Sequence, residues 1–99
     1  MIRLVNIKRD PIPPDGIYIG RENGWLGLGG SKWQNPFPMK RESERVGVLE
    51  QYRQHIESSP ELIAALPELK DKTLCCYCAP KRCHGNVLID LYTKYVDPN

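Results

Sequence analysis

All four cysteines of this 99-residue chain fall in one run, CCYCAPKRC at 75–83, and the rest of the chain has none. Disulfides within such a run would close very short, strained loops and would restrain almost nothing. The fold is therefore expected to depend on a hydrophobic core, which is thin in a domain of this length. Unpaired thiols also predict a reducing compartment, the cytoplasm.

The composition is that of a single globular domain over residues 1–99. Hydrophobic residues make up 40% of the chain, charged residues make up 26%, and the net charge is +2. So small a charge does not predict binding to nucleic acid or to an acidic membrane by bulk electrostatics, although a nucleic-acid partner stays open. No apolar run approaches ~18 residues, and the first residues, MIRLVNIKRDP, lack the features of a secretory signal. A membrane partner is not expected.

Three short strands are predicted. Two of them, IRLVNI at 2–7 and IYIGR at 17–21, are separated by the turn sequence IPPDG at 12–16. The third, DKTLCCYC at 71–78, ends before Ala79-Pro80. Between the second strand and the first helix, residues 22–39 are rich in glycine and hold both tryptophans, which we expect to cover the core. A long loop in so small a domain is usually functional.

Three helices are predicted, one of them very short. The first runs from an N-cap at Ser43 to about Ile56, the second is opened by Pro60 and ended by Pro67, and the last starts near Cys83. The expected buried face of the first helix is Val46, Leu49, Tyr52 and Ile56. The expected buried face of the last helix is Val87, Leu88, Leu91 and Tyr95. This order predicts an α/β domain in two or three layers, with a sheet of about three or four strands, at least partly parallel, and helices packed on it.

The cysteine run lies where a strand ends and a helix begins. In open α/β sheets, ligands bind at the carboxyl ends of strands, beside helix N-termini. Gly20-Arg21 ends another strand, and the arginine fork suits a carboxylate or phosphate. We therefore expect one polar site at one sheet edge, with Asn35 aimed at the ligand by the turn at Pro36. The predicted ligand-binding residues are Gly20, Arg21, Asn35, Pro36, Cys78, Pro80, Cys83 and His84.

The cysteine–histidine cluster is compatible with three kinds of chemistry. A metal site, with zinc as the candidate cofactor, would use Cys76, Cys78, Cys83 and His84, although the spacing C-x-C-x4-C-H lacks the usual C-x2-C knuckle. A catalytic role would fall to Cys83 and His84, because a partly exposed thiol at a helix N-terminus beside Lys81 and Arg82 is favoured as the thiolate. The structural alternative is a buried thiol and a hydrogen-bonded histidine, and for Cys75 the structural reading is preferred.

The segments IYIGR, NPF and LKDKTLCCYCAPKRCHGNVLIDL together resemble an uncharacterised family of phages and bacteria, domain of unknown function 4326. The resemblance covers about residues 15–92, and its specific part is the cysteine–histidine segment. The matching positions are Gly20, Arg21, Asn35, Pro36, Phe37, Cys76, Cys78, Pro80, Cys83, His84 and Gly85. The chain departs from the pattern at Asp71, where the family tends to have glycine, and at Asn86, where it tends to have aspartate. The resemblance implies a shared site and names no reaction.

These observations favour a protein that binds a nucleotide or a nucleotide-derived, phosphate-bearing small molecule, with enzymatic activity left open. One alternative is a zinc or iron–sulfur protein that uses the cysteine–histidine cluster. Another is a phage protein that inhibits a host factor, in which case the compartment is the host cytoplasm.

Overall fold

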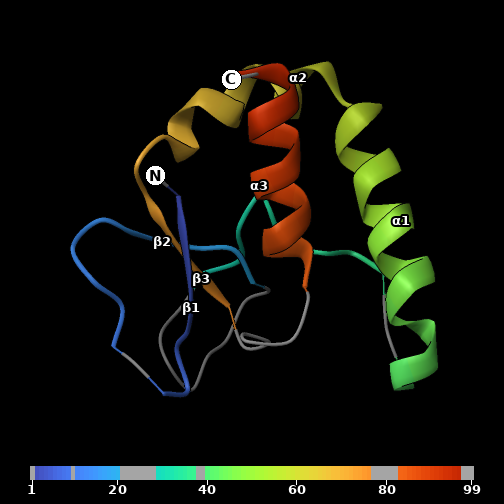
Figure 1. Cartoon of the computed structure of the whole chain (residues 1–99), viewed down its shortest axis with the longest axis horizontal. Coiled ribbons are helices and arrows are strands. Elements are labelled where there is room, and N and C mark those ends of the chain that lie inside the picture. The colour runs from blue at the N-terminus through green and yellow to red at the C-terminus, as the bar shows by residue number, and fades with distance from the viewer. Residues whose placement is uncertain (1, 10, 21–28, 38–39, 77–82, 97–99) are drawn as a thin grey trace.

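The strands form one small, wholly parallel sheet. The structure, a computed structural model, describes residues 2–9, 11–20, 29–37, 40–76 and 83–96 (Figure 1). Its strands are β1 (Arg3–Asn6), β2 (Gly16–Tyr18) and β3 (Thr73–Cys76), in the order β1-β3-β2. Both outer strands pair with β3 in parallel. The predicted α/β class is therefore confirmed.

The central strand, β3, is buried on both faces. Leu74 and Cys76 belong to the main hydrophobic core. On the other face, Thr73 donates a hydrogen bond from Oγ1 to Asp15 Oδ2 at 3.0 Å, and Cys75 is completely buried close to Gly16. A strand covered on both sides shows no polar alternation, which explains the continuous apolar sequence TLCC.

The helices pack together beside the sheet. They are α1 (Arg45–Glu57), α2 (Pro60–Ala65) and α3 (His84–Tyr95), with the short 3-10 helices η1 (Glu42–Glu44) and η2 (Leu66–Leu69). In Figure 1, α3 stands between the strands and α1, and it contacts both α1 and η2. None of the described helices is long and apolar enough to cross a membrane. The core they enclose contains Ile19, Trp33, Leu49, Tyr52, Ile56, Leu66, Leu69, Leu74, Cys76, Cys83, Val87, Leu88 and Leu91.

The start of α1 differs from the prediction. Ser43 does not cap the helix, because it lies inside η1, which leads directly into α1. The Glu44 carboxylate instead closes this end, since its Oε1 accepts hydrogen bonds from the backbone N–H groups of Arg41 at 2.9 Å and Lys40 at 3.1 Å. A glutamate at the third position that accepts from the N-cap backbone N–H is half of a capping box, and it closes the helix end without a serine at the N-cap.

The second helix begins as predicted and ends differently. Ser59 caps α2, because its Oγ accepts a hydrogen bond from the Leu62 N–H at 3.4 Å. The α-helix ends at Ala65, but Pro67 does not end the helical path, which continues as η2. Proline is tolerated here because it lies in the first turn of η2, where its missing N–H costs no helical hydrogen bond.

Two residues predicted on buried helix faces are exposed. Val46 is 81% exposed, whereas Val48 is 7% exposed. The buried face of α1 therefore follows the four-residue spacing Val48, Tyr52, Ile56, and Val46 falls outside it. Tyr95 is 44% exposed, and its hydroxyl donates a hydrogen bond to Glu57 Oε2 at 2.6 Å, which holds the ring at the surface.

Candidate functional site

The carboxyl ends of the three strands meet at the N-terminus of α3. Beyond β1, the Ile7 N–H donates to the Cys76 carbonyl at 2.9 Å, and beyond β2, the Ile19 N–H donates to the Cys75 carbonyl at 3.0 Å. The His84 ring then joins α3 to this edge, because its Nε2 lies 2.7 Å from the Ile19 carbonyl oxygen. This is the sheet edge at which the sequence predicted a site, and we call it the carboxyl edge.

Two of the thiols meet at the carboxyl edge. Cys76 is the last residue of β3 and Cys83 is the N-cap of α3, and their Sγ atoms lie 3.6 Å apart. Cys76 Sγ also lies 3.7 Å from the Val5 carbonyl oxygen. The two thiols are 1% and 2% exposed. The predicted partial exposure of Cys83 is therefore wrong, because the end of the sheet and the first turn of α3 close over its thiol.

Cys83 and Asn86 cap α3 together. The Cys83 N–H donates to Asn86 Oδ1 at 2.8 Å, and the Asn86 N–H donates to the Cys83 carbonyl at 2.9 Å. The first of these bonds is half of a capping box, whose other half is the Asn86 backbone N–H facing the Cys83 side chain. Asn86 is one of the two positions at which the chain departs from the family pattern, and an aspartate oxygen could accept the same hydrogen bond. Asn86 therefore stabilises the start of α3, the helix that Cys83 caps.

The next two residues of the motif dock α3 onto the sheet. His84 makes an edge-to-face contact with Tyr52, with ring centroids 5.1 Å apart. Gly85 is buried, and a Cβ added there would come within 2.5 Å of Leu4 Cδ1 and 3.1 Å of Ile19 Cδ1. Glycine at this position therefore lets the first turn of α3 approach β1 and the end of β2. His84 and Gly85 therefore pack α3 against the sheet and α1, whatever chemical role the motif has.

Tyr52 is buried where α1 meets the motif. Its hydroxyl donates to the Trp33 carbonyl at 2.7 Å. Burial, and then the charge of a Cys83 thiolate, raise the pKa of Tyr52 far above its ordinary value. Tyr52 therefore stays a neutral hydrogen-bond donor, and it links the loop before α1 to the start of α3. Burial also raises the pKa of Cys75, with a smaller effect from Cys76, and the completely buried thiol is consistent with the structural reading.

Gly20 and Asn35, from the two other predicted motifs, take part in local hydrogen bonds. The Gly20 carbonyl accepts a hydrogen bond from the Ser31 N–H at 3.1 Å, and a Cβ at Gly20 would overlap the Tyr18 ring. Asn35 Oδ1 accepts the Phe37 N–H at 2.9 Å across the exposed Pro36. The Asn35 side chain thus shapes its own turn, and its contact with a ligand stays a prediction.

Several predicted site residues lie outside the described ranges. They are Arg21, Cys78, Pro80, Lys81 and Arg82, together with Trp25 of the loop. Among the residues that the structure does describe, no group of three Cys, His, Asp or Glu side chains is placed to hold a metal ion. Zinc binding therefore stays a prediction.

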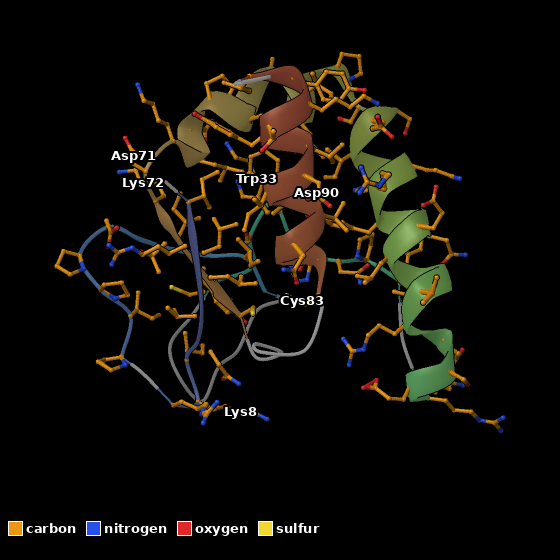
Figure 2. The ribbon with its side chains drawn as sticks, viewed as in Figure 1. Lys8, Trp33, Asp71, Lys72, Cys83 and Asp90 are labelled. Atoms are coloured by element: carbon orange, nitrogen blue, oxygen red, sulfur yellow. The ribbon has the colours of Figure 1, made fainter. Side chains whose placement is uncertain are left out.

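Lys8 and Arg9 were not among the predicted site residues, but they lie at the carboxyl edge. Both are exposed and follow β1 directly, in a turn held by the Lys8 N–H to Asn6 Oδ1 at 2.9 Å. Figure 2 shows Lys8 beyond the end of β1, whereas Lys72 precedes β3 at the opposite end of the sheet. Lys8 and Arg9 could have been identified by assuming that β1 pairs in parallel with β3. That pairing brings the residues after β1 to the carboxyl edge.

Fold and edge together define a small α/β domain with a parallel three-stranded sheet and a thiol-containing carboxyl edge. Residues 2–94 match the family model described as "Domain of unknown function (DUF4326)". An uncharacterized protein of Acanthamoeba polyphaga mimivirus is 39% identical over 103 residues, which cover 93% of this chain and 78% of the relative. The chain belongs to this family, as its motifs predicted. No solved structure matches it.

Proposed function

We propose that the protein binds a nucleotide or a nucleotide-derived, phosphate-bearing small molecule at the carboxyl edge. The observation that carries this proposal is the meeting of three parallel strand ends with the N-terminus of α3. The first turn of a helix presents backbone N–H groups and the positive end of the helix dipole. Anionic groups are stabilised at such a position, and it is the usual ligand position in parallel α/β sheets.

Charge at this edge supports an anionic ligand. Lys8 and Arg9 follow β1, and β1 ends beside Cys76, whose thiol touches that of Cys83. The two cations thus lie at the same edge as the start of α3. Hydrogen bonds from such side chains to phosphate are charge-assisted and stronger than neutral ones.

The test compares phosphate binding by two variants, each of which lacks two positive charges at one end of the sheet. Inorganic pyrophosphate and ADP are titrated calorimetrically into the wild type and into Lys8→Ala/Arg9→Ala. We expect at least about tenfold weaker binding in the double variant, the equivalent of one lost charge-assisted contact. The matched control is Lys70→Ala/Lys72→Ala, which removes the same charge at the opposite end and should bind as the wild type does. Equal affinity in all three proteins, or no binding to any, would reject the proposal.

A second candidate function, binding of a thiophilic metal ion, is favoured by one distance. Thiolates bound to tetrahedral zinc at ~2.3 Å are separated by about 3.8 Å. The Sγ atoms of Cys76 and Cys83 are 3.6 Å apart, close to this value and far from the ~2.05 Å of a disulfide. Two of the four predicted ligands are thus suitably spaced. Of the other two, His84 is engaged with the Ile19 carbonyl, and Cys78 lies outside the described residues.

The absorption spectrum with cobalt(II) tests the metal-binding function. Tetrahedral cobalt thiolates absorb intensely, and each thiolate ligand adds to the charge-transfer band. Metal-binding protein should show these bands with Co²⁺, and Cys76→Ser and Cys83→Ser should each weaken them. Cys75→Ser is the matched control, because Cys75 is equally buried and adjacent in sequence but faces away, its Sγ 3.6 Å from the Thr73 carbonyl oxygen. Protein that is metal-free when purified and spectrally silent with Co²⁺ would exclude the metal function.

A further inference from the structure

A wide, open depression lies beside α1, outside the carboxyl edge. Its volume is about 460 Å³, within the range of ~300–1,000 Å³ that is common for small-molecule sites. It is lined by Phe37, Gln51, Gln54, His55 and Ser58. None of these described lining residues is lysine, arginine, aspartate or glutamate, so the depression has no strong attraction for a phosphate.

Aromatic rings connect this depression to the start of α3. Phe37 meets His55 edge to face with ring centroids 5.9 Å apart, and His55 lies 6.4 Å from Tyr52. Tyr52 in turn contacts His84 at 5.1 Å. Both histidines of the chain therefore belong to one row of rings, which runs from the NPF turn to the helix end at the carboxyl edge.

Two residues of this row, Phe37 and Tyr52, are held in position by hydrogen bonds. The Phe37 N–H is bound by Asn35, and the Tyr52 hydroxyl is bound by the Trp33 carbonyl, so residues 33–37 are fastened to α1. Phe37 and His55 are only partly buried, so parts of their surfaces stay accessible. Such partly exposed, fixed rings can accept a flat partner with little loss of side-chain entropy.

The other lining groups suit the edge of a heterocycle. Gln51 and Gln54 are exposed on α1, and each carboxamide offers both donors and an acceptor. The Ser58 hydroxyl donates to the His55 carbonyl at 3.1 Å, and its oxygen can still accept. Stacking on an aromatic ring combined with paired amide contacts is a common way to recognise a nucleobase.

We infer that this depression binds the nucleobase of the ligand, stacked on the Phe37 ring and in edge contact with His55, with its polar edge toward Gln51 and Gln54. The inference rests on the proposed function, because it supplies the uncharged half of a ligand whose phosphate lies at the carboxyl edge. Inorganic phosphate compounds would then use only one half of the site, and nucleosides only the other.

The experiment measures the two halves separately. Adenosine, guanosine, cytidine and uridine, their 5′-diphosphates and inorganic pyrophosphate are titrated into ¹⁵N-labelled protein and followed by NMR. At least one nucleoside should shift the side-chain amide signals of Gln51 and Gln54. Phe37→Leu keeps an apolar side chain but removes the ring, and it should weaken that nucleoside by about tenfold or more without changing pyrophosphate affinity. Phe37→Tyr should restore binding, and Glu50→Ala, an exposed change on α1 outside the depression, should have no effect.

The outcomes separate this inference from the proposed function. If pyrophosphate binds normally but no nucleoside shifts the glutamine amides up to millimolar concentration, the inference is wrong and the phosphate proposal stands. If a nucleoside binds at the depression and pyrophosphate does not bind, the inference stands and the phosphate proposal falls. Nucleoside binding that Phe37→Leu leaves unchanged also overturns the inference.

Discussion

The Sγ atoms of Cys76 and Cys83 lie 3.6 Å apart, so the last residue of the central strand touches the residue that caps the final helix. Both thiols are almost completely buried. The contact places Cys76 and Cys83 within the core at the carboxyl edge, and it makes the start of α3 depend on the end of β3.

The described thiols should be protected in the native protein. Cys75, Cys76 and Cys83 are at most 2% exposed, so alkylation at these positions requires local or global opening of the fold. Iodoacetamide pulses followed by peptide mass spectrometry should label them slowly in buffer and fully in denaturant. Labelling of native Cys83 at the rate of an unstructured thiol would contradict its burial and favour an accessible, reactive cysteine.

Gly85→Ala should destabilise the protein by about 1 kcal/mol. The new methyl group would press on Leu4 and Ile19, and overpacking of this kind outweighs the small gain in helix propensity. In a domain of this size that corresponds to a melting temperature lower by about 4–8 °C.

The control for Gly85 is Gly47→Ala. Gly47 lies in α1 with no atom within 4 Å of an added Cβ, so alanine there should stabilise the protein by about 0.5–1 kcal/mol. Thermal melts that shift in the same direction for both variants would show that Gly85 has no packing role.

Val46→Ala and Val48→Ala test the orientation of α1. The substitution is identical, but Val46 is 81% exposed and Val48 is 7% exposed. We expect a change within about 0.5 kcal/mol for Val46 and a loss of about 1–2 kcal/mol for Val48. Urea unfolding curves measure both free energies, and the reverse ranking would mean that α1 is rotated from the orientation described.

Tyr52→Phe should cost about 1–2 kcal/mol, because it leaves the buried Trp33 carbonyl without its 2.7 Å donor. Tyr95→Phe is the matched control, since the same hydroxyl is removed from an exposed hydrogen bond to Glu57. Its cost should be below about 0.5 kcal/mol. Equal unfolding free energies for the two variants would show that the buried hydrogen bond is not stabilising.

Tyr52 should also make the protein sensitive to alkali. Its pKa is raised in the folded state from an ordinary value of 10.0, so above that pH the unfolded chain releases a proton that the folded protein retains. Unfolding is then favoured, and stability should be intact below about pH 10 and fall as the pH rises beyond it. Melting temperatures between pH 8 and 11 should fall less steeply for Tyr52→Phe than for the wild type, and parallel curves would disprove the assignment.

Local patterns in the sequence were sufficient for the order of elements and for some helix ends. Alternating and β-branched residues indicated the strands, and Ser59-Pro60 indicated the start of α2, since capping and proline geometry are decided within a few residues. The family motifs were likewise readable, because their residues are close together along the chain. The choice between Val46 and Val48 was not, since three- and four-residue spacings both fit a helix and only the neighbouring elements select the buried one.

The tertiary structure alone decided what the motif residues touch. Parallel pairing of β1 with β3 brings Lys8 and Arg9 to the edge that carries Cys83, although more than seventy residues separate them from it. The burial of Cys83 also depends on how closely α3 approaches the sheet, which Gly85 permits. The row of rings from Phe37 to His84 unites a loop and two helices. Such contacts depend on packing between distant segments, and no local pattern encodes them.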